Sequence, residues 1–124
     1  MRLCVLGDLL LDVIVRLDEP LARSADASAR TSLGPGGQAA NVAAWAAELG
    51  AEARLVCKRG DDDAGRLAAA AIRSRGVEVV GPVAEGRTGT VVSLVAPDGD
   101  RTMASDRGIA PELRAEELEP EWLD

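Results

Sequence analysis

The stretch Gly34-Pro35-Gly36-Gly37-Gln38-Ala39-Ala40-Asn41 opens an alanine-rich segment that continues to Gly50. We expect a helix over Ala39–Leu49, closed by Gly50. The glycine pair lets the backbone approach a bound molecule and adopt φ angles that other residues avoid. The first helical turn adds unpaired N–H groups and a partial positive charge, which suit an oxygen-rich ligand. With the Asn41 amide, which both donates and accepts, the stretch predicts a site for a polyhydroxylated molecule.

Strand and helix patterns alternate around this motif. Short apolar runs over Arg2–Gly7 and Ala53–Cys57 are typical of buried parallel strands. A second helix is expected over Asp63–Arg75, with Asp62 or Asp63 near its start and Gly76 past its end. This order predicts an α/β fold with a parallel sheet. Further short elements are expected: extended segments over Val13–Leu17, Ser28–Leu33 and Glu78–Val80, and a short acidic helix over Pro111–Leu118.

A hairpin is predicted near the middle of the second half of the chain. The β-rich runs Thr88–Ala96 and Arg101–Ser105 flank Pro97-Asp98-Gly99-Asp100, and Asp-Gly between such runs is a hairpin signal. The hairpin and the early extended segments do not fit the parallel sheet. We therefore expect a small β-layer outside it, such as a lid, from residues of about 13–33 and 88–106.

Composition limits what the core and the chemistry can be. The 124 residues make one domain or part of one, without Phe or Tyr, so Leu, Val and Ala must form the core. Trp45 is expected to pack in that core. There is no histidine, so acid–base work would fall to carboxylates, and no metal site is expected. Cys4 and Cys57 lie in apolar runs and are interpreted as buried reduced thiols.

The charge and the N-terminal sequence bear on partners and location. A formal net charge of -7 argues against nucleic acid and against anionic membrane surfaces. Asp8 and Asp12 interrupt the first apolar run, so we expect neither a signal peptide nor a membrane span. These features predict a cytoplasmic protein.

Asp12 is the strongest candidate for a ligand-binding carboxylate. It lies five residues past Gly7, beyond the end of the first predicted strand, and ligands bind at that edge of open α/β sheets. Alone, Asp12 also fits a solvated loop or capping residue, but the glycine turn and Asn41 favour binding. Asp8, directly after the glycine, is more typical of a turn. Two nucleotide fingerprints, G-x-G-x-x-G and G-K-[ST], are absent.

Other polar residues fit structural roles as well as functional ones. Gln38 alone fits a solvated loop residue, and Gly36-Gly37 alone fits a bare turn. The run Arg59-Gly60-Asp61-Asp62-Asp63 is interpreted as a turn and a helix cap rather than a ligand site. Arg101 and Arg107 follow the hairpin; they fit solvated charges, although an arginine on a lid can also meet an anionic group.

The order of these motifs resembles the N-terminal half of the ribokinase-like, or phosphofructokinase-B type, carbohydrate kinases. The resemblance covers essentially the whole chain. It rests on the following matches: Gly7 through Asp12, Gly36 through Ala43, Leu49-Gly50-Ala51, Gly60-Asp61-Asp62 with Gly65, Gly76-Val77, Thr88-Gly89, and a hairpin ending at Arg107-Gly108. It implies a three-layer αβα sandwich with a parallel sheet and a small β-lid, of which residues 1–124 form the N-terminal part.

The resemblance also implies an activity and a set of binding residues. Kinases of this type transfer the γ-phosphoryl group of ATP, with Mg²⁺, to a sugar or nucleoside hydroxymethyl group. Asp12, Gly36, Gly37, Gln38 and Asn41 would then hold acceptor hydroxyls. The lid would exclude water from the reaction, with Arg107 meeting an anionic group there. A homodimer through the β-lid is an assembly that fits.

Departures from the family pattern leave the substrate and the activity open. Ribokinase typically has asparagine where Leu10 stands and often lysine where Gln38 stands, so the sugar is open. The Gly-Ala-Gly-Asp signature that carries the catalytic base in complete members is absent from the sequence. The resemblance therefore places the catalytic base, ATP and Mg²⁺ outside these residues.

Three hypotheses follow from these observations. The first is the acceptor-binding half of a sugar kinase, cut short and inactive alone. The second is a non-catalytic sugar-binding or partner module with this half-fold. The third is a small α/β enzyme of unrelated chemistry, which the missing histidine and nucleotide motifs disfavour. If the chain is a half, its open sheet edges predict poor solubility, dimerisation or partial melting.

Overall fold

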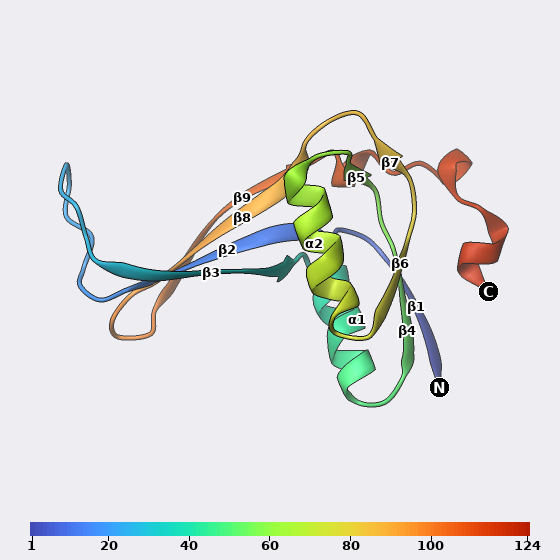
Figure 1. Ribbon diagram of the computed structural model, residues 1–124, viewed down its shortest axis with the longest axis horizontal. Helices are drawn as coiled ribbons and strands as arrows, with labels where there is room; N and C mark the ends of the chain where they lie inside the picture. The colour runs from blue at the N-terminus through green and yellow to red at the C-terminus, as the bar shows by residue number, and fades with distance from the viewer.

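The computed structural model describes all residues, Met1–Asp124. A three-stranded sheet carries two helices, and a long four-stranded sheet projects from one end of it (Figure 1). We call these the core sheet and the projecting sheet. A short pairing of β5 (Arg59–Gly60) with β7 (Val83–Ala84) lies beside the core sheet. The predicted α/β class and the separate β-layer are both present.

The core sheet is parallel and has the strand order β1-β4-β6. Its members are β1 (Arg2–Leu6), β4 (Glu52–Val56) and β6 (Val77–Val80). Helices α1 (Gln38–Glu48) and α2 (Asp63–Arg73) pack on the same face of this sheet. The buried side chains between them are mostly small, because alanines of both helices meet Ala53 and Leu55 of β4 and Cys57 just after it. Close packing of small residues replaces the missing aromatic core.

The opposite face of the core sheet carries the C-terminal segment. Three short 3₁₀ turns occupy Ala110–Glu112, Ala115–Glu117 and Pro120–Leu123, so the predicted helix over Pro111–Leu118 is wrong. Glu117 accepts the Arg114 N–H and pairs with Lys58 at 2.6 Å, which holds a tight turn in place of a helix.

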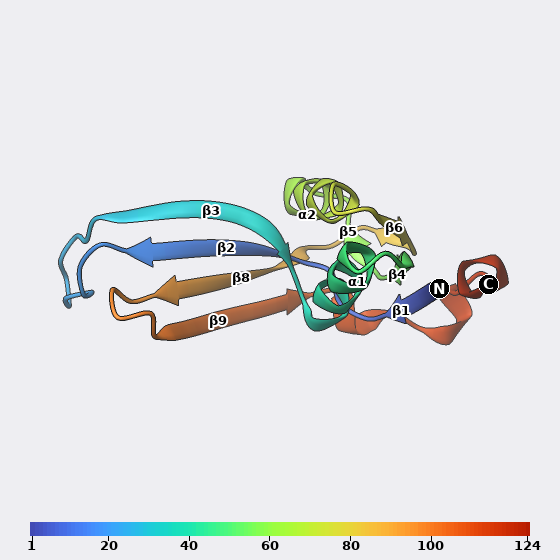
Figure 2. The same cartoon turned by 90° about the horizontal axis from the view of Figure 1, so that it is seen from below.

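The projecting sheet has the order β3-β2-β8-β9. It consists of β2 (Leu10–Leu17), β3 (Ala29–Gly36), β8 (Thr88–Val95) and β9 (Arg101–Gly108). The central pair β2–β8 is parallel, and the two outer pairs are antiparallel. Figure 2 shows the four strands running side by side away from the helices. The hairpin predicted around Pro97–Asp100 joins β8 to β9.

Two predictions about buried side chains are wrong. Trp45 is 69% exposed on α1, and Cys4 is exposed on β1, whereas Cys57 is buried as expected. The cause is the position of these elements, since β1 is an edge strand and α1 has one face without a neighbour. Sequence pattern marked both residues as apolar neighbours of core positions but did not say which side was covered.

No helix of the chain combines the length and the apolar character that crossing a membrane requires.

Candidate functional site

The N-terminus of α1 is held open by a glycine. Gly37 is the N-cap residue, with φ 96° and ψ 144°, and no side chain caps the helix. A Cβ at this position would collide with the Asp8 carbonyl, so the turn requires glycine. The first intrahelical bond runs from the Asn41 N–H to the Gly37 carbonyl at 3.0 Å. The backbone N–H groups of residues 38–40 lie ahead of that ladder and have no side-chain cap.

Asp12 lies on β2, next to this turn. In the projecting sheet it is paired with Gly34 on β3 and with Val91 on β8. A Cβ on Gly36 would come within 3.1 Å of the Asp12 Cβ, so the glycine turn and the carboxylate are in close contact. The structure therefore brings Asp12 and Gly36 together and places Gly37 against Asp8, and the binding role of these residues stays a prediction.

Ser93 orients the Asp12 carboxylate and was missed by sequence reasoning. Its hydroxyl donates to Asp12 Oδ1 at 3.0 Å, and Ser93 is only 1% exposed. Asp12 Oδ2 has no hydrogen-bond donor within the protein. A serine in the apolar run Val91–Val95 was the available signal, because a hydroxyl in a buried strand requires a hydrogen-bond partner.

Asp8 and Arg107 form a two-pronged ion pair across the base of the projecting sheet. Arg107 Nε donates to Asp8 Oδ2 at 2.6 Å, and its Nη2 donates to Oδ1 at 3.2 Å. The Asp8 side chain is 17% exposed and that of Arg107 is 59% exposed. The hydrogen bond that Arg107 donates to Asp8 raises the pKa of Arg107 above its ordinary value. Asp8 thus does more than form a turn, and Arg107 already has an anionic partner.

A hollow of about 580 Å³ lies between the end of β1 and the start of α1. Gly7, Asp8, Gln38 and Arg107 contribute to its wall, together with the apolar side chains of Val5, Leu6, Ala39 and Val42. It joins the glycine turn to the ion pair, and Asp12 is not among the residues that line it.

Asn41 lies apart from this hollow. It is exposed on α1 and faces a different hollow of about 330 Å³, with Trp45, Glu48 and Arg75. The Gln38 side chain is exposed at the rim of the first hollow. The structure thus brings Gln38 to the glycine turn but does not place Asn41 beside Asp12, and the binding role of Asn41 stays a prediction.

The acidic run before α2 has the structural role that the sequence favoured. Asp62 is the N-cap of α2, and its Oδ1 accepts the Gly65 N–H at 2.9 Å. Asp61 and Asp63 are exposed and pair with Arg66. No three histidine, cysteine, aspartate or glutamate side chains come together in a way that could hold a metal ion.

Comparisons with known proteins fit this arrangement. The family described as "pfkB family carbohydrate kinase" matches residues 1–124. The chain belongs to this family. An ATP-dependent ribose-1-phosphate kinase from Halopiger xanaduensis is 36% identical over 111 residues, which are 87% of this chain and 38% of that protein. Ribokinase from Bacillus subtilis is 32% identical over 110 residues, 86% of this chain and 37% of the relative.

Solved structures of pfkB-type kinases match the fold. A structure described as a putative ribokinase from Agrobacterium tumefaciens has a TM-score of 0.82 at 16% identity, covering 95% of this chain and 40% of its own. Ribokinase from Arabidopsis thaliana, solved with ribose and ATP, has a TM-score of 0.67 at 28% identity, covering 86% of this chain and 36% of its own. The fold is ribokinase-like, and the chain spans well under half the length of these pfkB-type relatives.

Proposed function

We propose that these residues form the acceptor-binding part of a kinase that transfers the γ-phosphoryl group of ATP to a sugar or nucleoside hydroxymethyl group. The observation that carries the proposal is that the uncapped start of α1 directly follows Gly36, which packs against Asp12, and that Asp12 keeps one carboxylate oxygen without a protein donor. A carboxylate accepts from sugar hydroxyls, and helix N–H groups donate to sugar oxygens. Family membership gives this site its chemistry.

In the proposal, the residues of this chain hold neither ATP nor Mg²⁺. They include neither a phosphate-binding G-K-[ST] loop nor a carboxylate cluster for a cation. In the proposal, ATP, Mg²⁺ and the catalytic base are therefore held by another part of the protein. What this chain supplies is the position of the acceptor, and positioning accounts for much of the rate of phosphoryl transfer.

The projecting sheet has a proposed role in closing the site. Its two central strands, β2 and β8, carry Asp12 and Ser93. The strands of the sheet extend away from the helices (Figure 2). In the proposal, residues of about 13–33 and 88–106 act as a lid that excludes water from the acceptor. Arg107, at the end of β9, would then exchange its contact with Asp8 for an anionic group of the substrates.

An acceptor panel tests this function. The polypeptide that contains these residues is purified from its source cell and incubated with ATP and a set of sugars and nucleosides. We expect transfer to one hydroxymethyl group, located in the product by ³¹P NMR. Sugar binding without any transfer would favour the alternative, a non-catalytic sugar-binding or partner module. If the polypeptide neither binds nor phosphorylates any acceptor, both the kinase function and the sugar-binding alternative are contradicted.

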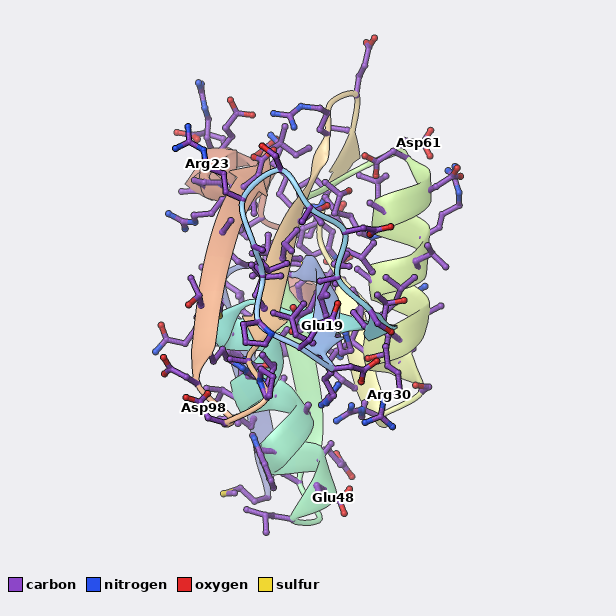
Figure 3. The ribbon with its side chains drawn as sticks, turned by 90° about the vertical axis from the view of Figure 1, so that its left-hand side faces the viewer. Glu19, Arg23, Arg30, Glu48, Asp61 and Asp98 are labelled. Carbon is purple, nitrogen blue, oxygen red and sulfur yellow. The ribbon has the colours of Figure 1, made fainter.

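A homodimer through the projecting sheet is the assembly we propose. Arg16 and Arg30 are directly paired on β2 and β3, and Arg101 lies in the same row beyond Val95, so three arginines share one face. None has a carboxylate partner, and like charges directly opposite are unfavourable without a counter-charge. The tip also carries acidic residues that form no salt bridge, including Glu19 and Asp98, whose carboxylates accept only backbone N–H groups (Figure 3). Two copies can satisfy both sets by symmetry.

Light scattering after size exclusion tests the dimer. We expect the double variant Arg16→Glu with Arg30→Glu to be monomeric at concentrations where the parent is dimeric. Arg73→Glu, on the last turn of α2, is the matched control and should stay dimeric. A parent that is monomeric, or an equal effect of both changes, would contradict this assembly.

Partners and location remain predictions. The net charge of -7 still argues against nucleic acid and anionic membranes. Both cysteines are free thiols, which fits the reducing cytoplasm where ATP-dependent sugar kinases would work.

A further inference from the structure

The Asp62 carboxylate joins α2 to the projecting sheet. Besides the Gly65 N–H, it accepts the Thr88 N–H at Oδ2, 2.9 Å away, and the Thr88 hydroxyl at Oδ1, 2.6 Å away. The Gly60 N–H donates in turn to the Thr88 hydroxyl oxygen at 2.8 Å. Thr88 is 6% exposed. One carboxylate thus holds the start of a helix and the first residue of β8 together.

Glycines provide the space for this network. A Cβ on Gly65 would collide with the Gly60 carbonyl and lie 2.6 Å from the Thr88 hydroxyl. A Cβ on Gly60 would collide with the Gly86 carbonyl and come within 2.9 Å of the Thr88 nitrogen. The glycines of the Gly60–Gly65 motif are therefore explained by the approach of Thr88, which the capping of α2 alone would not require.

The strand that Thr88 anchors also carries the residue that orients Asp12. Thr88 begins β8, and Ser93 lies five residues further along the same strand. From Leu11 to Arg16, β2 is hydrogen-bonded in parallel register with Thr90 to Val95 of β8. A shift of β8 at its base would therefore move Ser93 relative to the core sheet, and Asp12 with it.

We propose that Asp62 and Thr88 are positioning residues for the acceptor site, acting through β8 and Ser93 on the Asp12 carboxylate. The expected effect on catalysis rests on the proposed function, whereas the anchoring of β8 by Asp62 and Thr88 does not. It gives the Gly60–Gly65 motif a role in substrate binding even though no residue of that motif lines the hollow beside α1.

Hydrogen exchange on the polypeptide that contains these residues tests the structural content. Thr88→Val removes the hydroxyl at nearly constant volume, and Thr88→Ser restores it. We expect Thr88→Val to lower protection of the β2 and β8 amides near Asp12 and Ser93 by about tenfold, and Thr88→Ser to recover most of it. Ser74→Ala is the control, because it removes a hydroxyl bond at the other end of α2. Equal loss in the control, or no recovery with serine, would overturn the proposal.

Steady-state kinetics of the complete kinase test the consequence. Thr88→Val should raise the KM for the acceptor by about tenfold while changing the KM for ATP little, and Thr88→Ser should rescue it. Unchanged acceptor KM in Thr88→Val, despite altered exchange, would overturn the positioning role. If the polypeptide transfers phosphate to no acceptor, the proposed function fails, and the exchange data then decide the anchoring of β8 separately.

Discussion

The two helices of the chain begin in opposite ways. At α2 the Asp62 carboxylate satisfies the Gly65 N–H and holds Thr88 as well. At α1 the cap residue is Gly37, and no side chain supplies an oxygen. The same backbone feature is therefore satisfied by the protein's own carboxylate in one helix and has no side-chain partner in the other.

The difference shows how a small α/β chain separates structure from binding. A helix start capped by its own aspartate has a structural role, because the carboxylate already accepts from its free backbone N–H groups. An uncapped start beside a carboxylate with one free oxygen has donors and an acceptor to offer. The four predictions below either break this contrast or sharpen it, and they are ordered from the largest expected effect to the smallest.

Replacing Gly37 by alanine should cause the largest loss of stability. The residue has φ 96°, and a Cβ there would collide with the Asp8 carbonyl, so both strain and overlap arise. We expect a loss of about 3 kcal/mol in the free energy of unfolding, measured by urea titration. Gly50→Ala is the control, since Gly50 has φ 94° but no atom within 4 Å of its Cβ position. It should lose only about 1 kcal/mol; equal losses would show that the turn at Gly37 is not crowded.

Replacing Asp62 by alanine should come next. The change removes the cap of α2 and leaves the Thr88 N–H without its partner, at a cost of about 2 kcal/mol in the free energy of unfolding. The neighbouring Asp63→Ala is the matched control, because Asp63 is exposed and pairs only with Arg66. That change should cost at most about 0.5 kcal/mol. Similar losses in the free energy of unfolding for the two variants would contradict the role of Asp62 in connecting α2 to β8.

The stability that Asp62 contributes should also depend on pH. Burial disfavours the charged form of Asp62, but the hydrogen bonds from Thr88 and Gly65 outweigh it, so the pKa of Asp62 lies below its ordinary value. The stability that this carboxylate contributes is therefore complete above about pH 4 and is lost as the pH falls through its lower folded-state pKa. The stability gap between the parent and Asp62→Asn should shrink over that range in urea titrations. A gap that stays constant down to pH 2 would exclude this linkage.

The two cysteines should differ in reactivity, with little effect on stability. Burial raises the pKa of the Cys57 thiol to about 11, whereas Cys4 is exposed on the edge strand β1. Iodoacetamide at neutral pH should therefore label Cys4 first, while Cys57 reacts only on unfolding. Peptide mass spectrometry over a time course measures this. Early labelling of Cys57 would mean that the alanine-rich core opens readily.

Local sequence signals predicted the secondary-structure elements better than they predicted which faces of those elements are buried. The glycine turn, the α1 helix, the Asp-Gly hairpin and the Asp62 cap follow from residues within a few positions of one another, so the pattern contained them. Trp45 and Cys4 were misjudged because burial depends on which face has a neighbour, and periodicity does not contain that information.

The missed parts of the candidate site are long-range contacts. Ser93 and Asp12 are 81 residues apart, and Arg107 and Asp8 are 99 residues apart. The Thr88–Asp62 contact spans 26 residues and links two segments that the sequence suggested only as a cap and a strand start. Such pairings are set by the register of β2 against β8 and of β8 against β9, which no single segment reveals.

The most direct test of the central claim is the steady-state kinetics of Asp12→Asn in the complete kinase. The change keeps the shape of the side chain and removes its charge and one acceptor oxygen. If Asp12 holds acceptor hydroxyls beside the open start of α1, the KM for the acceptor rises by about tenfold or more while the KM for ATP is unchanged. Equal increases in both constants, or no increase in either, would contradict the account and remove Asp12 from the acceptor site.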